Sequence, residues 1–466
     1  MQSGDSRERA MRMGKDSVWS LIAKFSTPAI ISMTVGSTYN IVDQIFVGHL
    51  GEDPLSALII VFPLMILFMA LSVGTAIGSS SLIARRLGAG DHEGADRVTC
   101  TTITLTLIIG ALITAICLPN LDTILGWIGA KGAMLPLAKE YMYILIIFAF
   151  LNTFTLVTGG IVRAQGAPTF PSVVLIILAL TNIALDPVFI YALDMGVAGA
   201  AVATVIARGL GMVLFIAYFA MGKTSFSFKL KYFVPDLRTV FEIYRIGLAS
   251  IVRMSGTSIA MAVSNTLALG FGPNTLNVFG VIMRSFSVVI MPIVGLTQGT
   301  LPLIGYNFGA KKLERVGEVV VKSAKVALVW GVICALIAFI IPEQVMSIFG
   351  SVDVSLGAYG LRIAGIGIIA LTLQITLTNF FQGIGKGVAS LLLTATPDIL
   401  LWIPGVFILT WLFADTGLWM VFPVVDTIAI TITIAWLVIT YRRLGIGFHL
   451  RYPRKLASAI ESAERE

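Results

Sequence analysis

Three polar residues of this chain stand inside long hydrophobic stretches, where they could bind a proton or a metal cation. Asp43 lies near the end of FSTPAIISMTVGSTYNIVDQIFVGHLG, and Asn182 and Asp186 lie in SVVLIILALTNIALDPVFIY. A carboxylate in hydrocarbon costs at least ~2.5 kcal/mol, so such residues usually face a partner or a water-filled cavity. If two carboxylates lie close together there, one must take a proton or a cation must neutralise both.

Helical spacing places the candidate groups on shared faces. Residues three or four apart lie on one side of a helix. The pairs with this spacing are Asn40 with Asp43, Asn182 with Asp186, and Ala200 with Thr204. The direction of each span puts all three pairs at one level, near the outer face of the membrane. Polar bonds between membrane helices average well under ~1 kcal/mol, so a purely structural role would offset two buried carboxylates poorly.

The groups gathered at this level would form a set of oxygen ligands. Carboxylates, an amide carbonyl, a Thr hydroxyl and a backbone carbonyl suit hard cations such as Na⁺, by the same logic as Ca²⁺ and Mg²⁺. Pro187 follows Asp186 directly, lacks a backbone N–H, and can free carbonyls near the site. The residues therefore predict a site for H⁺, Na⁺ or each in turn.

Three further positions are candidates around the same site. Pro28 lies fifteen residues before Asp43 in the same hydrophobic stretch and permits a kink. We expect it to act as a hinge that bends the first helix when Asp43 is protonated; a static kink is the alternative. Tyr141 and Asn152, together with Asn40, are candidates for lining the cavity.

The elements that must position these residues follow from the composition. The 466 residues are 57% hydrophobic and only 12% charged, whereas soluble domains are about 25% charged. Apolar runs of ~20 residues span a bilayer as helices, whereas a barrel would show alternating segments of ~10 residues. We therefore predict an all-α polytopic membrane protein with twelve spans. The expected spans are 19–48, 55–86, 98–119, 137–164, 170–193, 196–222, 239–270, 275–307, 318–341, 357–384, 387–413 and 417–440.

Basic residues fall on alternate connections and at both ends of the chain. One set of connections carries nearly all of them, namely Arg85, Arg86, Arg97, Arg163, Lys223, Lys229, Lys231, Arg238, Lys311, Lys312, Arg315 and Lys386. The other set carries only Lys131 and Lys139 among several acids. This bias predicts that both termini are cytoplasmic, and it explains the net charge of +7 without nucleic-acid binding.

The two halves of the chain resemble each other. Three glycines at the end of the second span and just after it, Gly74, Gly78 and Gly88, recur 221 residues later as Gly295, Gly299 and Gly309. IVRAQGAP (161–168) matches FFQGIGKG (380–387), and LDMG (193–196) matches ADTG (414–417). Six spans per half give a parallel repeat about an axis along the membrane normal, which suits two lobes that rock around a central cavity.

The predicted organisation therefore has five parts. They are a cytoplasmic segment (1–18), an N-lobe (19–222), a cytoplasmic loop (223–238), a C-lobe (239–440) and a basic cytoplasmic tail (441–466).

Several motifs resemble the multidrug and toxic compound extrusion (MATE) transporters over essentially the whole chain. They are YNIVDQIFVGHLG, SSSLIARRLGAGD, RAQGAPTFP, TNIALDPVFIY and QGTLPLIGYNFGAKK. Within this family the chain looks like the archaeal and DNA-damage-inducible-protein (DinF-like) branch. The other well-known branch carries a Glu in the seventh span and an Asp in the tenth, whereas the stretches SIVRMSGTSIAMAVSN and GIGIIALTLQITLTNFFQG of these spans contain no acid in this chain.

The resemblance implies a cation site and a transport activity. It implies Asp43, Asn182, Asp186 and Thr204 as side-chain ligands, with Ala200 offering its carbonyl. It also implies a non-enzymatic secondary antiporter of the cell membrane, without cofactors, that exports amphipathic or cationic organic compounds against H⁺ or Na⁺. We expect it to act as a monomer in the lipid bilayer.

Three other functions remain as alternatives. A flippase for lipids or lipid-linked oligosaccharides would need several basic residues in the cavity, and only Arg208, Arg253 and Arg284 are deep candidates. A membrane enzyme would need clustered catalytic or metal-binding side chains, which the spans lack. A passive channel would not need two rocking lobes. In the C-lobe, we expect Asp398 near the start of its helix, where it would stabilise that N-terminus, and Asp426 deeper in the membrane.

Overall fold

The computed structural model describes residues 8–132, 134–348 and 353–446. Side chains that are not described within these ranges are those of Thr38, Tyr39, Asn40, Ile41, Gln44 and Glu52. The predicted tail beyond 446 and the side chain of Asn40 therefore lie outside the described part. Within it, ten helices are long and apolar enough to cross a membrane, and two bent helix pairs raise the number to twelve. The prediction of a helical protein with twelve spans is confirmed.

The N-terminal half forms one group of helices, which we call the N-lobe. It consists of α2 (Val18–Gly48), α3 (Glu52–Gly88), α4 (His92–Cys117), α5 (Leu121–Trp127), α6 (Met134–Ile147), α7 (Ala149–Ala164), α8 (Thr169–Pro187), η1 (Val188–Ala192) and α9 (Gly196–Ala220). The fourth span is the pair α6 and α7, bent by 52°.

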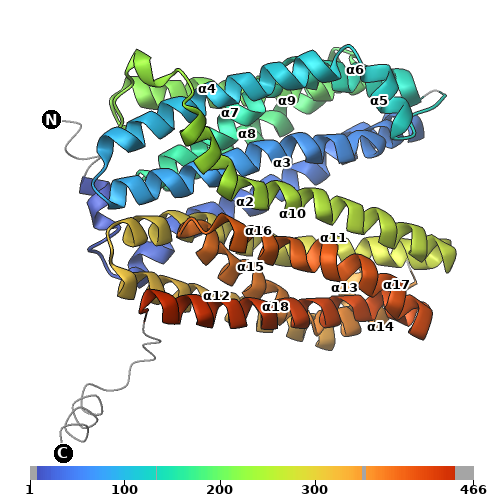
Figure 1. The fold of residues 1–466 in the computed structure, drawn as a ribbon. Coiled ribbons are helices and arrows are strands. Elements are labelled where there is room, and N and C mark those ends of the chain that lie inside the picture. Colours follow the sequence, from blue (N-terminus) through green and yellow to red (C-terminus); the bar gives the residue numbers. More distant parts are fainter. Residues whose placement is uncertain (1–7, 133, 349–352, 447–466) are drawn as a thin grey trace, which may run out of the picture.

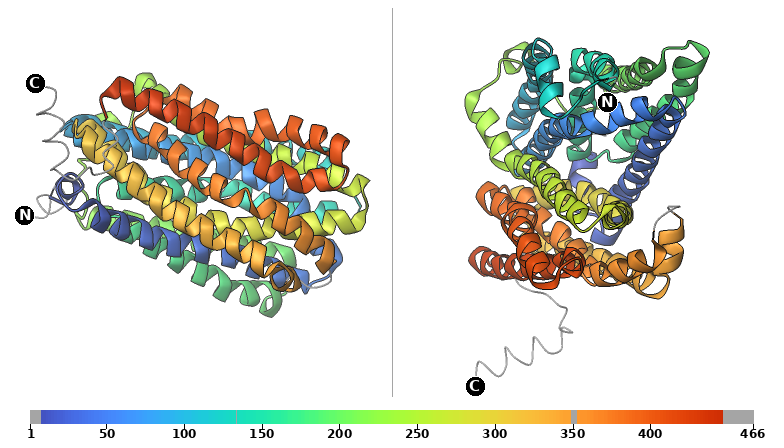
Figure 2. Two further views of the ribbon diagram at one scale, coloured as in Figure 1. Left: turned by 90° about the horizontal axis from the view of Figure 1, so that it is seen from below. Right: turned by 90° about the vertical axis from the view of Figure 1, so that its right-hand side faces the viewer.

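The C-terminal half forms the second group, the C-lobe, and a short helix, η2 (Leu230–Tyr232), lies in the loop between the lobes. The C-lobe consists of α10 (Leu237–Gly270), α11 (Pro273–Gly309), α12 (Leu313–Ile340), α13 (Pro342–Ser347), α14 (Val354–Gly365), α15 (Ile368–Gly383), α16 (Gly387–Ala395), η3 (Thr396–Leu401), α17 (Trp402–Phe413) and α18 (Thr416–Leu444). Its tenth span is again a bent pair, α14 and α15, at 45°. Figure 1 and the view along the helices in Figure 2 show the two halves as separate groups.

The backbone repeats between the halves. Left-handed φ angles occur in pairs at nearly constant offset: Gly51 with Gly272, Gly90 with Lys311, Gly166 with Gly385, and Asp194 with Ala414. Glycine adopts such angles without steric cost, but lysine and alanine do so rarely, so the turn geometry itself has been retained in both halves. These paired turns support the predicted duplication.

The glycines that repeat in the sequence lie where the two lobes touch. A Cβ on Gly78 of α3 would lie 2.2 Å from the carbonyl oxygen of Ile243 in α10, and one on Gly299 of α11 would lie 2.7 Å from the carbonyl carbon of Phe25 in α2. Gly88 and Gly309 bring α3 and α11 together, with Cβ positions 2.0 Å from opposing carbonyl oxygens. Only glycine permits backbones to approach this closely.

These contacts gather toward one end of the bundle, which we call the basic end. It holds the connections 89–91, 165–168, 221–236, 310–312 and 384–386, and both the start of α2 and the end of α18 lie there (Figure 1, left). Arg86 of the N-lobe bridges Asp91 at 2.8 Å and Glu242 of the C-lobe at 3.2 Å. The hydroxyls of Thr75 and Tyr244 also meet across the lobes at 3.0 Å. The lobes are thus closed against each other toward the basic end.

Candidate cation site

Asn182, Asp186 and Thr204 form a hydrogen-bonded cluster between α8 and α9. The Asn182 amide donates to Asp186 Oδ1 at 3.1 Å and to Thr204 Oγ1 at 3.4 Å. Asn182 is 2% exposed and Asp186 is fully buried. The four-residue spacing on α8 therefore places both side chains on one face, as the sequence predicts.

Asp43 of α2 approaches this cluster from a third helix. It lies near enough to Asp186 for the two carboxylates to interact electrostatically. The end of α2 is held beside this region by Tyr191 of η1, whose hydroxyl donates to the Phe46 carbonyl at 2.6 Å. The rings of Phe46 and Tyr191 also meet edge to face, with centroids 6.3 Å apart. Three separate elements thus bring two acids and an amide together.

Three oxygens of the cluster are buried and accept no hydrogen bond from any described residue. They are Asp43 Oδ1, Asn182 Oδ1 and Asp186 Oδ2. Buried acceptors normally find a donor, and an unpaired one costs about 1–3 kcal/mol. All three need a positive partner, which a proton on a carboxylate or a hard cation with oxygen ligands supplies. This set of oxygen ligands therefore fits either H⁺ or Na⁺.

The helix changes its geometry directly beyond this cluster. α8 ends at Pro187, and Val188–Ala192 continue as a π-helix, in which the Leu193 N–H donates to the Val188 carbonyl at 2.9 Å. Single π-helical turns are frequent at functional sites. The expectation that Pro187 disturbs the helix beside Asp186 agrees with this geometry.

Three other candidate residues with described side chains lie on α6, α7 and α9 of the N-lobe. Ala200 is fully buried on α9, one turn from Thr204, Tyr141 of α6 is 3% exposed, and Asn152 of α7 is half-buried. Their roles as a carbonyl ligand and as cavity-lining residues stay predictions. The role of Asn40 also stays a prediction, because its side chain lies outside the described part.

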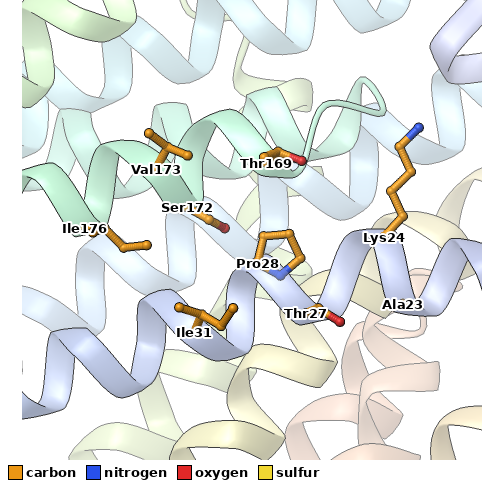
Figure 3. Close-up of a pocket in the computed structure, with 9 residues that line it drawn as sticks. All are labelled: Ala23, Lys24, Thr27, Pro28, Ile31, Thr169, Ser172, Val173 and Ile176. Atoms are coloured by element: carbon orange, nitrogen blue, oxygen red, sulfur yellow. The ribbon is translucent and has the colours of Figure 1, made fainter.

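Pro28 lies in the interior of α2, which continues as one helix on both sides of it. Its ring faces a cleft of about 420 Å³ between α2 and the start of α8, where Lys24 lies at one end and Ile176 at the other (Figure 3). The ring of a proline also removes one hydrogen bond of the helix. The cleft leaves room for α2 to bend at Pro28, and the hinge stays a prediction.

The charged groups of the C-lobe are arranged differently. Asp398 does not lie at a helix start, as we expected, but in η3, a π-helical segment eleven residues into its span. Its Oδ2 accepts a hydrogen bond from Thr257 at 3.2 Å and lies 4.0 Å from Arg253 Nε. The expectation was wrong because the span begins at 387, as predicted, and Asp398 therefore lies beyond the first turns of the helix.

Two polar partners were not found by the sequence analysis. Tyr191 follows the predicted site within the motif TNIALDPVFIY, but nothing in its spacing marks it as a partner of α2. The pairing of Arg253 with Asp398 joins residues 145 positions apart, and it depends on how α10 and η3 are rotated toward each other. Hydropathy contains no signal for that rotation.

Comparisons with known proteins agree with this architecture. The MatE family model matches the chain twice, over residues 28–188 and 249–408, so the matches begin 221 and end 220 residues apart. The "Multidrug export protein MepA" of Staphylococcus saprophyticus is 25% identical over 407 residues, which cover 87% of this chain and 90% of that protein.

Two solved structures are also similar along nearly their whole length. One is described as a MOP superfamily transporter from Pyrococcus furiosus whose reversed binding-pocket polarity suggests a different function; it is 29% identical, with a TM-score of 0.89. That match covers 94% of this chain and 99% of the other. The second is an outward-facing multidrug resistance MATE family transporter, 29% identical with a TM-score of 0.88, covering 93% and 98%. The double family match independently supports the duplication.

Proposed function

The chain belongs to the MatE family of transporters, and on that premise we propose that it exports amphipathic, often cationic organic compounds in exchange for inward H⁺ or Na⁺. The name of its staphylococcal relative, a multidrug export protein, supports this substrate class. We assign the basic end to the cytoplasm of a cell whose plasma membrane the chain spans as a monomer.

The observation that carries the proposal is the set of three unpaired buried oxygens on Asp43, Asn182 and Asp186. Three buried acceptor oxygens without a donor favour a cation, and two carboxylates near each other strengthen that preference. Thr204 would add a hydroxyl oxygen and Ala200 a carbonyl. These groups would bind H⁺ or Na⁺ in turn with the substrate.

Coupling follows from reciprocity between the two ligands. If cation binding disfavours cargo binding, then cargo binding disfavours the cation by the same factor. The lobes are closed toward the basic end, which we assign to the cytoplasm, so the described state would release cargo outward and admit the cation. Bending of α2 at Pro28 would link the charge on Asp43 to the shape of the cavity.

A flippase of the same superfamily has less support. An anionic headgroup needs free basic side chains in the cavity, but the deep Arg253 already lies beside Asp398 at 4.0 Å. Arg284 is exposed on α11.

The proposal can be tested in proteoliposomes loaded with ethidium, a fluorescent organic cation. We expect a pH gradient or a Na⁺ gradient, imposed separately, to drive ethidium movement by the native protein. Asp186→Asn should reduce this movement to the level of protein-free liposomes. Asp194→Asn is the matched control, because Asp194 is exposed near the end of the same span and Asn tolerates its left-handed φ of 52°.

Two results would contradict the proposal in different ways. Full gradient-driven transport by Asp186→Asn would contradict the assignment of the cation site but not the proposed transport activity. If neither gradient drives ethidium movement by the native protein, the proposed antiport mechanism itself is contradicted.

A further inference from the structure

The C-lobe holds a second pair of carboxylates, remote in sequence from the candidate cation site. Asp398 of η3 has two partners from α10, the hydroxyl of Thr257 at 3.2 Å and the guanidinium of Arg253 at 4.0 Å. The side chains of Asp398 and Arg253 are 23% and 31% exposed, so this pair lies at the edge of the packed core. Arg253 and Asp398 together are electrically neutral.

Asp426 lies on α18, which packs against η3, and it is almost completely enclosed. It is only 4% exposed, and its Oδ2 accepts no hydrogen bond from the described residues. Asp398 and Arg253 are near enough to interact with it electrostatically. Asp426 is therefore one acid more than the single arginine can balance.

The other elements packed against α18 offer no second counter-charge within the described residues. α15, α16 and α17 contain no Asp, Glu, Lys, Arg or His. α14 carries Arg362, which is ion-paired with Glu343 at 2.7 Å. η3 contributes only Asp398 itself. An ionised Asp426 would thus remain a buried charge in excess, which low dielectric surroundings strongly disfavour.

The chemistry of this site differs from that of the N-lobe cluster. Na⁺ needs several oxygen ligands, and the N-lobe offers three unpaired ones with no basic side chain in the cluster. Asp426 offers one unpaired oxygen, and the nearby Arg253 would repel a metal cation. A proton needs only one oxygen, so it is the cation that fits.

We propose that Asp426 is a second proton-binding site of this protein, located in the C-lobe and balanced by the Arg253–Asp398 pair. Asp398 is the group through which we expect this proton to exchange, because its side chain is 23% exposed whereas Asp426 is 4% exposed. π-helical η3 supplies the break in the span that brings Asp398 beside α10. This proposal goes beyond the proposed exchange at the N-lobe site, and it is the same whether the N-lobe site binds H⁺ or Na⁺.

The test measures the proton directly and needs no transport. The full-length protein is purified into lipid nanodiscs at neutral pH, and infrared spectra are recorded in H₂O and D₂O. A protonated carboxylic acid gives a carbonyl band that ionised carboxylates lack and that shifts on deuteration. We expect this band in the native protein. The component of the band that arises from Asp426 should remain in Asp186→Asn and should be lost in Asp426→Asn.

Two further variants make the test decisive. Asp415→Asn, on the N-terminal cap of the same helix, should leave the band unchanged. Asp426→Glu should keep a protonated acid but move its frequency, which guards against misfolding of the Asn variant. Folding is checked by size-exclusion profile and thermal unfolding. Identical spectra for the native protein, Asp426→Asn and Asp426→Glu would overturn the proposal.

Discussion

The two lobes share a backbone but differ in where they keep their charge. The offset of 221 residues at which the family matches begin places Ser264 opposite Asp43, and the offset of 220 at which they end places Trp402 opposite Asn182. In the C-lobe these two residues bond to each other, since Trp402 Nε1 donates to Ser264 Oγ at 2.9 Å. An indole and a hydroxyl thus occupy the positions that carry a carboxylate and an amide in the N-lobe.

The comparison shows that duplication has conserved turns and lobe contacts more strictly than site chemistry. The left-handed turns and the glycine contacts recur at nearly constant offset. The acids do not: Asp398 lies about two helical turns earlier in its span than the position that corresponds to Asp186. Symmetry is therefore a guide to the motion of the two lobes and a poor guide to what each binds.

The largest expected effect concerns the candidate cation site of the N-lobe. Asp186→Asn removes a carboxylate from the cluster, and we expect gradient-driven ethidium transport to fall by ~100-fold, the upper range of typical coupling factors. Asp194→Asn should stay near the native rate. Retention of coupling in Asp186→Asn would mean that the C-lobe alone can drive transport.

The second prediction concerns the contact that both lobes share. Gly309→Ala places a Cβ 2.0 Å from the Arg85 carbonyl oxygen, so it should destabilise the closed contact at the basic end by ~1–3 kcal/mol. Cysteines introduced at Thr75 and Tyr244 report closure by cross-linking, whose yield should fall. Gly280→Ala on the same helix has no atom within 4 Å and is the control. Equal cross-linking in both variants would show that the contact adapts to a side chain.

The third prediction sharpens the comparison by counting protons. If the proton on Asp426 moves with each transport cycle, Asp426→Asn lowers the number of protons exchanged per cargo by one. At zero membrane potential and a tenfold proton ratio, the cargo ratio at which net flux stops should then fall about tenfold. An unchanged stopping ratio, with the infrared band present, would assign Asp426 a proton that stays bound.

The smallest effect compares two threonines at the two sites. Thr204→Val removes the hydroxyl that accepts from Asn182, and we expect it to weaken cation affinity by about 1 kcal/mol, roughly fivefold. Thr257→Val removes a donor from Asp398 in the C-lobe and should leave that affinity unchanged. The cation concentration for half-maximal transport measures both. Equal shifts would indicate that the two sites are not independent.

Local patterns in the sequence predicted much of this molecule. The twelve spans follow from apolar length, and the shared face of Asn182 and Asp186 follows from helical spacing, because both are properties of one segment. The bends between α6 and α7 and between α14 and α15 were not predicted, since no proline lies at either break. Tyr191–Phe46 and Arg253–Asp398 were missed because each joins two helices whose relative rotation is set only by packing.

The glycine contacts between the lobes also bear on how easily this protein can change shape. Where two backbones touch directly, no long side chains interlock, so the surfaces can part without rotamer rearrangement. A transporter that alternates between two states benefits from an interface that packs closely through its backbones and separates without rearranging long side chains.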